Sequence, residues 1–132
     1  MKIRQLKSSD TKQVIDLWTS SFSRNFNKTL NPDYLNDPSS TTMVVCEENT
    51  IIGVASIHII YKLSRTLGLI EDVAVNKDHR GKGIGKSLVE KLIEIGKQKN
   101  CDKIVLNTSE KNSKFYEKIG FEKNEIQMVI RN

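Results

Sequence analysis

Cysteine, histidine and long apolar runs are scarce in this chain, and each scarcity excludes a class of protein. Only two cysteines occur, Cys46 and Cys101, without a Cys-x-x-Cys pair, and only two histidines could join them, so no metal site is predicted. Burial is the expected state of both thiols. No apolar run approaches the length of a membrane span, and the chain does not start with the apolar stretch of a signal peptide. We expect a cytoplasmic protein that does not bind membranes.

A strong excess of charge of one sign is also missing. Lys and Arg number 21 against 16 for Asp and Glu, which leaves a net charge of +5. The basic residues are interleaved with acids and few aromatics accompany them, so we expect no nucleic-acid partner, but the excess suits a phosphate-bearing ligand. At 132 residues, 37% of them hydrophobic, the chain suits one domain that spans residues 1–132.

Alternating and helical patterns of apolar residues predict an α/β (α+β) fold with a mixed sheet flanked by helices. The predicted strands cover residues 2–6, 42–46, 51–60, 67–75, 103–108 and 126–131. A first helix is predicted after the capping residues Ser8, Ser9 and Asp10, and its pattern fades into the polar run 24–28. Two further helices are predicted at residues 84–99 and 112–119. Residues 29–40 hold both prolines and predict a long loop or a broken helical turn, of the kind that often borders a binding site.

Two adjacent acids, Glu71 and Asp72, lie inside the strand predicted at residues 67–75. Side chains alternate between the faces of a strand, so one of the acids must point to the face on which Ile70 does not lie. A lone buried carboxylate is costly. The pair therefore indicates either a functional site or a structural feature that compensates the charge.

A glycine-rich turn at residues 78–87 lies between a predicted strand and a predicted helix. Free backbone N–H groups and the helix dipole favour an anion there, and glycine lets the main chain approach phosphate closely. A Walker A loop fails on spacing, because the Gly-Lys-Ser at 85–87 requires glycine where Arg80 stands. A dinucleotide-binding loop also fails, because only Ile84 separates Gly83 from the next glycine instead of two residues.

What fits the turn is Arg, two residues, Gly, one residue and Gly, at positions 80, 83 and 85. A second element, Asn-x-x-Phe-Tyr-x-x-x-Gly-Phe, follows downstream; its defining residues are Asn112, Phe115, Tyr116, Gly120 and Phe121. With both elements in this order, the chain resembles the GCN5-related N-acetyltransferase superfamily. For the loop taken alone, a turn that merely reverses the chain is the alternative.

The resemblance implies a mixed, mostly antiparallel sheet, with acetyl-coenzyme A as the co-substrate and no metal. It also implies that the strand before the turn splays from its neighbour and offers backbone groups to the pantetheine arm, with the N–H of Val73 on the thioester oxygen. The residues that bind the coenzyme would then be Val73, Ala74, Val75, Arg80, Gly81, Lys82, Gly83, Ile84, Gly85, Lys86, Asn112 and Tyr116.

The same resemblance implies candidates for the catalytic groups. Tyr116 corresponds to the family tyrosine that donates a proton to the departing thiolate, and its alternative is a buried tyrosine between helix and sheet. Glu71 and Asp72 lie just upstream of the coenzyme strand, where a carboxylate can take the ammonium proton directly or through water. We expect one of the two acids to act on the substrate, with base and substrate ligand both open.

From Gly68 to Arg131 the chain is similar to eukaryotic-type glucosamine 6-phosphate N-acetyltransferases. This implies an intertwined homodimer in which the C-terminal strand helps to build the neighbour's substrate pocket. Arg131 would then lie near the sugar phosphate, where its planar fork suits phosphate oxygens; a frayed C-terminal charge is the alternative. Two departures stand out. Asn107 replaces an acid of that subgroup and can bind substrate but not accept a proton, and the first 66 residues match only in outline.

The best single prediction is an enzyme that acetylates the amine of glucosamine 6-phosphate by direct attack in a ternary complex. A second prediction keeps the fold and changes the acceptor to a polyamine, an aminoglycoside or a protein amine. A third, from another class, is a non-catalytic sensor module that binds coenzyme A.

Overall fold

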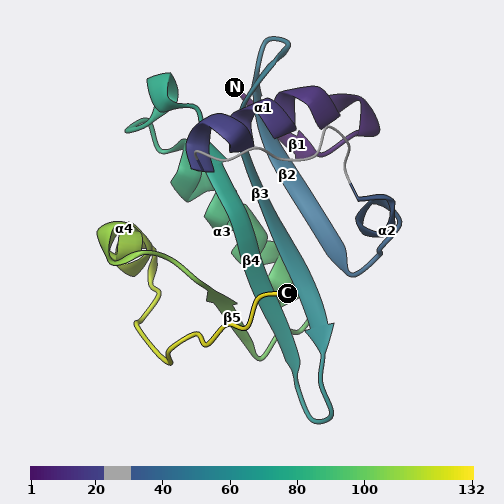
Figure 1. Ribbon diagram of the computed structural model, residues 1–132, viewed down its shortest axis with the longest axis vertical. Coiled ribbons are helices and arrows are strands. Elements are labelled where there is room, and N and C mark those ends of the chain that lie inside the picture. Colours follow the sequence, from purple (N-terminus) through teal and green to yellow (C-terminus); the bar gives the residue numbers. More distant parts are fainter. Residues whose placement is uncertain (23–30) are drawn as a thin grey trace.

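The computed structural model describes residues 1–22 and 31–132. A strand and two α-helices come first, three consecutive strands follow, and the last strand lies between two α-helices (Figure 1). The strands are β1 (Lys2–Gln5), β2 (Ser40–Glu47), β3 (Thr50–Tyr61), β4 (Thr66–Val75) and β5 (Lys103–Leu106). The α-helices are α1 (Thr11–Phe22), α2 (Pro32–Leu35), α3 (Ile84–Gln98) and α4 (Glu110–Ile119), and two short 3-10 helices are η1 (Ser8–Asp10) and η2 (Lys77–His79).

The five strands form one sheet in the order β1-β2-β3-β4-β5. The first three pairings are antiparallel, and β4 pairs with β5 in parallel through the crossover helix α3. A parallel pair needs such a crossover because a tight turn reverses the chain. The predicted mixed, mostly antiparallel sheet flanked by helices is confirmed.

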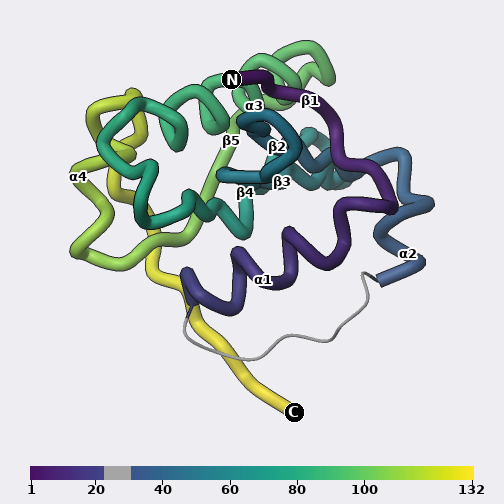
Figure 2. The backbone as a smooth tube through the Cα atoms, turned by 90° about the horizontal axis from the view of Figure 1, so that it is seen from above, coloured from purple at the N-terminus to yellow at the C-terminus, as the bar shows by residue number. Residues whose placement is uncertain are grey.

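Helices cover both faces of the sheet, with α1 on one face and α3 on the other (Figure 2). Against α3 the sheet buries branched aliphatic side chains such as Ile52, Ile57 and Ile70, which contact Leu88 and Leu92. A second, smaller cluster lies under α1; its members are Val14, Leu17, Val44, Cys46, Ile51, Val54 and Ala74. Alternation along β2 and β3 feeds both clusters, because successive side chains of a strand point to opposite faces.

Polar contacts fix the position of α1 on its face. Asp10, only 5% exposed, accepts two hydrogen bonds from the Arg4 guanidinium at 2.8 and 2.9 Å, and these hold the pKa of its carboxyl below the ordinary value. At the other end, Trp18 Nε1 donates to the carbonyl of Asp72 at 3.3 Å. The helix is thereby fastened to the part of β4 where the two acids lie.

Most predicted elements are found, with small differences at their ends. Residues 32–35 form the one-turn helix α2, as the alternative of a broken helical turn predicted. The polar run 24–28, into which the first helix was expected to fade, lies outside the described residues. The strand predicted at 103–108 ends at Leu106, so Asn107 stands beyond it.

The strand predicted at residues 126–131 is wrong for the chain by itself, because residues 120–132 contain no helix or strand. A strand needs a neighbour for its backbone groups, and no described strand of this chain pairs with the segment. Its apolar side chains are therefore left in solvent: Ile126 is 86%, Met128 87% and Ile130 98% exposed. The residues alternate as predicted, but no described strand of this chain pairs with them.

Candidate active site

A bulge in β4 shapes the centre of the site. Ser56 of β3 lies opposite Glu71, whereas Val54 lies opposite Ala74, so β4 carries one extra residue between these pairs. Asp72 adopts a left-handed conformation there, with φ of 57°. Bulges bend a strand and leave backbone groups unpaired, and a non-glycine residue in this conformation is uncommon. The adjacent acids of the sequence thus mark a local break in the ladder.

Beyond Ile70, β4 has no partner on the side of β5. The parallel ladder runs from the pair Leu67–Lys103 to the pair Ile70–Leu106 and stops there. β4 itself continues to Val75, so Val73 and Ala74 have no β5 residue to pair with in the described sheet. A backbone edge is consequently open beside the bulge, as the expected splay of the two strands requires.

The chain turns from β4 into α3 through a segment held by its own polar groups. Asn76 Oδ1 accepts from the N–H of Asp78 at 2.9 Å, and Arg80 Nε donates to the carbonyl of Val75 at 3.2 Å. Gly81 and Gly83 have φ values of 80° and 81°. Glycine is the residue that adopts this conformation without steric cost, which explains the two glycines of the turn.

The first turn of α3 faces the same open edge. Gly83 is the N-cap residue, and the first internal bond of the helix joins Ser87 N–H to the Gly83 carbonyl at 3.0 Å. The N–H groups of Ile84, Gly85 and Lys86 therefore precede the helical ladder, and such groups, with the helix dipole, form an anion site. Lys82 and Lys86 are exposed beside them and add positive charge.

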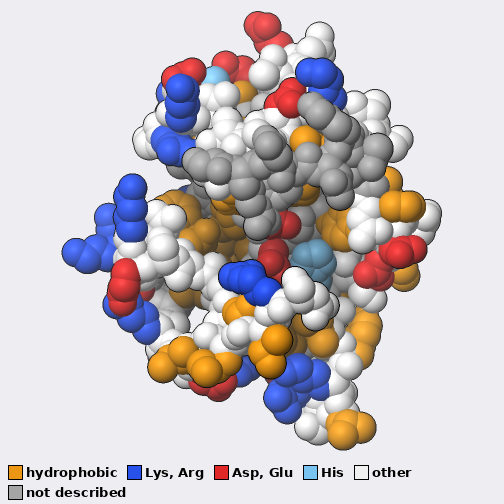
Figure 3. Space-filling view, viewed as in Figure 1, with side chains coloured by type: hydrophobic (Ala, Val, Ile, Leu, Met, Phe, Trp, Pro, Cys, Tyr) orange, Lys and Arg blue, Asp and Glu red, His pale blue; other side chains and the backbone are white. Residues whose placement is uncertain are grey.

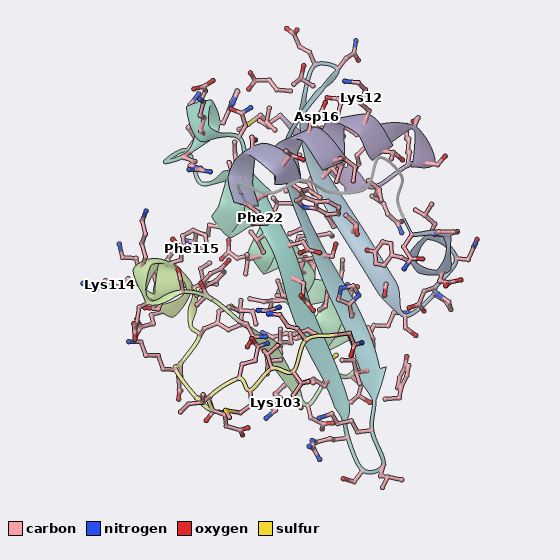
Figure 4. The ribbon with its side chains drawn as sticks, viewed as in Figure 1. Lys12, Asp16, Phe22, Lys103, Lys114 and Phe115 are labelled. Carbon is pink, nitrogen blue, oxygen red and sulfur yellow. The ribbon has the colours of Figure 1, made fainter. Side chains whose placement is uncertain are left out.

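Helix α4 packs against this turn because position 85 has no side chain. A Cβ on Gly85 would lie 3.2 Å from Phe115 Cζ and 3.5 Å from Val75 Cγ2. Figure 4 shows Phe115 directed from α4 toward the body of the molecule, whereas Lys114 points outward and Lys103 projects from the far end of β5. The glycine thus lets the two sequence elements of the family pattern meet in space.

Tyr116 lies behind Phe115, half-buried between α4 and the sheet. Its ring contacts Phe115 and Phe121 edge-on, with centroids 4.9 and 6.0 Å apart. Desolvation by burial raises the pKa of the phenol above its ordinary value, so the hydroxyl keeps its proton at neutral pH and is available as a donor. Asn112 is exposed on the first turn of the same helix.

Polar side chains line up across the sheet on the face covered by α1. Thr42, Ser56 and Glu71 are consecutive cross-strand neighbours. The buried hydroxyls of Thr42 and Ser56 lie 2.7 Å apart, and the Tyr34 hydroxyl of α2 joins both. Glu71 is exposed at the end of this row. In the space-filling view of Figure 3, acidic side chains lie next to a histidine near the middle of the molecule. We call the surface formed by Thr42, Ser56, Glu71 and Tyr34 the acceptor face.

Most of the predicted residues lie on β4, the turn and α4, and the other two lie in segments without helix or strand. Asn107 follows β5 and Arg131 lies in the C-terminal segment, both exposed. No hydrogen bond or ion pair between residues of the described ranges joins either one to Glu71. The row of hydroxyls and Tyr34 was missed from the sequence. The available signal was the alternation of Ser56 and His58 with buried aliphatics in β3, which places polar groups on one face.

Comparison with known proteins identifies the fold and its family. Residues 11–121 match the model of the acetyltransferase (GNAT) family. The chain belongs to this family. The match includes the bulge, the open end of β4, the turn and α4, so the resemblance drawn from the two sequence elements is confirmed.

Individual relatives narrow the similarity. Glucosamine 6-phosphate N-acetyltransferase of Trypanosoma brucei brucei is 46% identical over 67% of this chain, and an enzyme of the same name from Dictyostelium discoideum is 45% identical over 62%. The alignments span 64% and 54% of those two proteins' own lengths. The crystal structure of the Arabidopsis thaliana enzyme has a TM-score of 0.87 at 31% identity, covering 98% of this chain and 97% of that one.

The described parts of the chain contain neither a cluster of metal-ligating side chains nor a helix that could span a membrane. No group of three or more His, Cys, Asp or Glu side chains is arranged to hold a metal ion in residues 1–22 and 31–132. None of the helices within those ranges has the length and apolar character needed to span a bilayer. A shallow groove on α3, lined by residues such as Glu90, Ile93 and Lys97, contains none of the predicted site residues.

Proposed function

We propose that the protein is an acetyl-coenzyme A-dependent N-acetyltransferase and that its acceptor is the amine of glucosamine 6-phosphate. The observation that carries the proposal is the continuous path from the unpaired end of β4, through the left-handed glycines, to the first turn of α3. Unpaired backbone groups suit an amide-bearing arm, and free helical N–H groups suit a pyrophosphate. Both chemical features belong to coenzyme A.

The residues present fit this co-substrate. A side chain at Gly81 or Gly83 would meet nothing within 4 Å, so the backbone at these positions is open to a ligand. In the proposed complex, the pyrophosphate lies on the N–H groups from Gly81 to Lys86, with Arg80 and Lys82 contributing charge. The edge from Val73 to Val75 binds the pantetheine arm, and Asn112 contacts the coenzyme from α4.

The chemistry requires a neutral amine, a polarised thioester carbonyl and a proton for the leaving thiolate. The N–H of Val73, next to the bulge, donates to the thioester oxygen. Tyr116 protonates the thiolate, and its raised pKa keeps the phenol in the required form. Glu71 and Asp72 lie on the approach of the acceptor, where a carboxylate binds the ammonium group before it loses its proton.

The sugar phosphate is favoured by the names of the relatives from Trypanosoma brucei brucei, Dictyostelium discoideum and Arabidopsis thaliana, which include this substrate. In the proposal, Arg131 pairs with the phosphate and Asn107 bonds a sugar hydroxyl. Polyamines, aminoglycosides and protein amines are the competing acceptors, and a non-catalytic coenzyme A sensor is the competing class. The half-buried phenol and exposed acids favour catalysis.

We also propose an intertwined homodimer. The exposed alternating side chains of residues 126–130 form an apolar stripe without cover, and Figure 2 shows the C-terminal segment leaving the body of the molecule on the side of α1. Pairing with a second copy would give the segment the neighbouring strand that the monomer lacks. It would also carry Arg131 to the partner's acceptor face. The cytoplasmic location and the single domain stay predictions.

A thiol-release assay over a panel of amines tests the proposal. The panel contains glucosamine 6-phosphate, unphosphorylated glucosamine, spermidine, an aminoglycoside and a peptide N-terminus. We expect the highest kcat/KM with glucosamine 6-phosphate, and we expect acetyl-coenzyme A to raise the melting temperature. A higher kcat/KM with spermidine than with glucosamine 6-phosphate would make a polyamine the acceptor. A thermal shift without turnover on any amine would favour the non-catalytic coenzyme A sensor.

A further inference from the structure

Three side chains at the edge of the acceptor face form a hydrogen-bonded chain. Ser40 Oγ donates to Asp37 Oδ2 at 3.0 Å and lies 3.0 Å from His58 Nδ1. A hydroxyl has a single proton. Since Ser40 gives that proton to the carboxylate, its oxygen accepts from Nδ1–H of His58. The imidazole is thereby held in the tautomer whose Nε2 carries a lone pair.

Asp37, at the outer end of this hydrogen-bonded chain, keeps the Ser40 hydroxyl donating toward it and not toward His58. The N–H of Ser39 donates to Asp37 Oδ1 at 2.8 Å, and this bond, followed by that of the Ser40 hydroxyl, lowers the pKa of Asp37. The carboxylate therefore stays ionised and acts only as an acceptor near neutral pH. The inner end is steadied by Tyr34, whose ring packs edge-on against the imidazole with centroids 5.7 Å apart.

The imidazole shares its face with Glu71. His58 lies opposite Leu69, and Ser56, two residues away on the same side of β3, lies opposite Glu71. Such diagonal neighbours are about 7–8 Å apart, within reach of long side chains. Among the described residues the hydrogen bonds of His58 end at Nδ1. Nε2 is left for a ligand on the acceptor face.

We propose that His58 Nε2 is the general base of the reaction, reached from the acceptor amine through one water molecule. The inference rests on the function proposed above. It provides a base in a chain where Asn107, whose amide cannot accept a proton, replaces the acid of the similar subgroup. Among the described residues, the charged groups on the side of the imidazole are Asp37 before β2 and Glu71 on β4, while the Tyr34 ring packs from α2.

The acceptor ammonium loses one proton to Nε2, and the neutral amine forms the C–N bond as the C–S bond breaks. The thiolate takes the phenol proton of Tyr116, and the second amine proton restores the phenol. The imidazolium then gives its proton to water, so that one proton is released in each turnover.

The test compares pH profiles of kcat/KM for wild type and three variants. His58→Asn keeps an N–H donor near Ser40 but removes the base, so we expect kcat at pH 7 to fall about 100-fold, the usual contribution of a general base. The KM for acetyl-coenzyme A should not change, and the acidic limb of the pH profile should disappear. Asp37→Asn lets the amide donate to Ser40, reverses the hydroxyl and turns the imidazole to the other tautomer, with a smaller loss of rate.

Glu71→Gln is the matched comparison. Loss of the acidic limb in Glu71→Gln, together with its retention in His58→Asn, would assign the base to Glu71 and overturn the proposal. The tautomer is checked separately by 15N NMR of the His79→Asn variant, which leaves His58 as the single histidine; a proton found on Nε2 contradicts the hydrogen-bond chain. If wild type acetylates no amine, the proposed function falls and the base with it. If wild type is active and His58→Asn equals it, the base alone falls.

Discussion

Replacing Gly83 by alanine tests the link between backbone conformation and coenzyme binding. Gly83 has φ of 81° and ψ of 8°, and a Cβ built there meets nothing within 4 Å. The cost of alanine is therefore conformational and not a clash. A left-handed L-residue costs roughly 1–2 kcal/mol, and the lower entropy of the unfolded chain returns about 0.4–1 kcal/mol. A net cost of about 1 kcal/mol follows from these two terms.

The cost of the alanine substitution appears either in the Tm or in the Kd for acetyl-coenzyme A. If the turn keeps its shape, the strain is present in the folded protein and Tm falls by about 4 °C, from a typical unfolding entropy per residue over a chain of this length. If the turn relaxes without ligand, Tm is unchanged, and acetyl-coenzyme A must restore the conformation when it binds. The Kd then rises about five-fold, which is 1 kcal/mol.

Differential scanning calorimetry and isothermal titration with coenzyme A measure the two quantities on the same samples. Gly83→Asn is the control, because asparagine tolerates the left-handed region better than alanine and both changes should be smaller. A Gly83→Ala protein with the Tm and the Kd of wild type would refute the reasoning, since neither folding nor binding would then require the left-handed turn.

Two further predictions concern the phenol and the C-terminal segment. Tyr116→Phe keeps the edge-on contacts of the ring and removes the proton donor, so kcat should fall while the Kd for acetyl-coenzyme A stays the same. Burial raises the pKa of Tyr116. Ionisation of the phenol should therefore not reduce the wild-type rate until the pH exceeds 10. Equal rates for both proteins would leave the tyrosine a packing residue. Ile130→Asp should weaken the proposed dimer by roughly 2–3 kcal/mol, since a fully buried isoleucine contributes about that much, and sedimentation over a concentration series measures it. Gln127→Asp, which changes the other side of the same segment, should dissociate far less, and a wild-type chain that sediments as a monomer would remove the dimer.

The sequence alone was sufficient for most of the helices and strands and for the position of the glycine-rich turn between β4 and α3. Alternation predicts β2, β3 and β4 because a strand buries one side chain in two on each face, and the spacing of Arg80, Gly83 and Gly85 is a local property of a single turn. The same locality explains the one wrong element. Residues 126–131 have the pattern of a strand, but a strand also requires a neighbour, and the pattern does not report whether the fold provides one.

Only the tertiary structure decided which distant residues share a surface. The bulge at Asp72, the end of the ladder at Ile70 and the approach of Phe115 to Gly85 depend on the register between segments far apart in the sequence. The chain from Asp37 through Ser40 to His58 likewise joins a loop to two strands. Long-range pairing is set by the packing of the whole sheet, so no local spacing encodes it. The spacing of the turn can therefore be read from the sequence, whereas the side chains that share the acceptor face follow from the pairing of the strands.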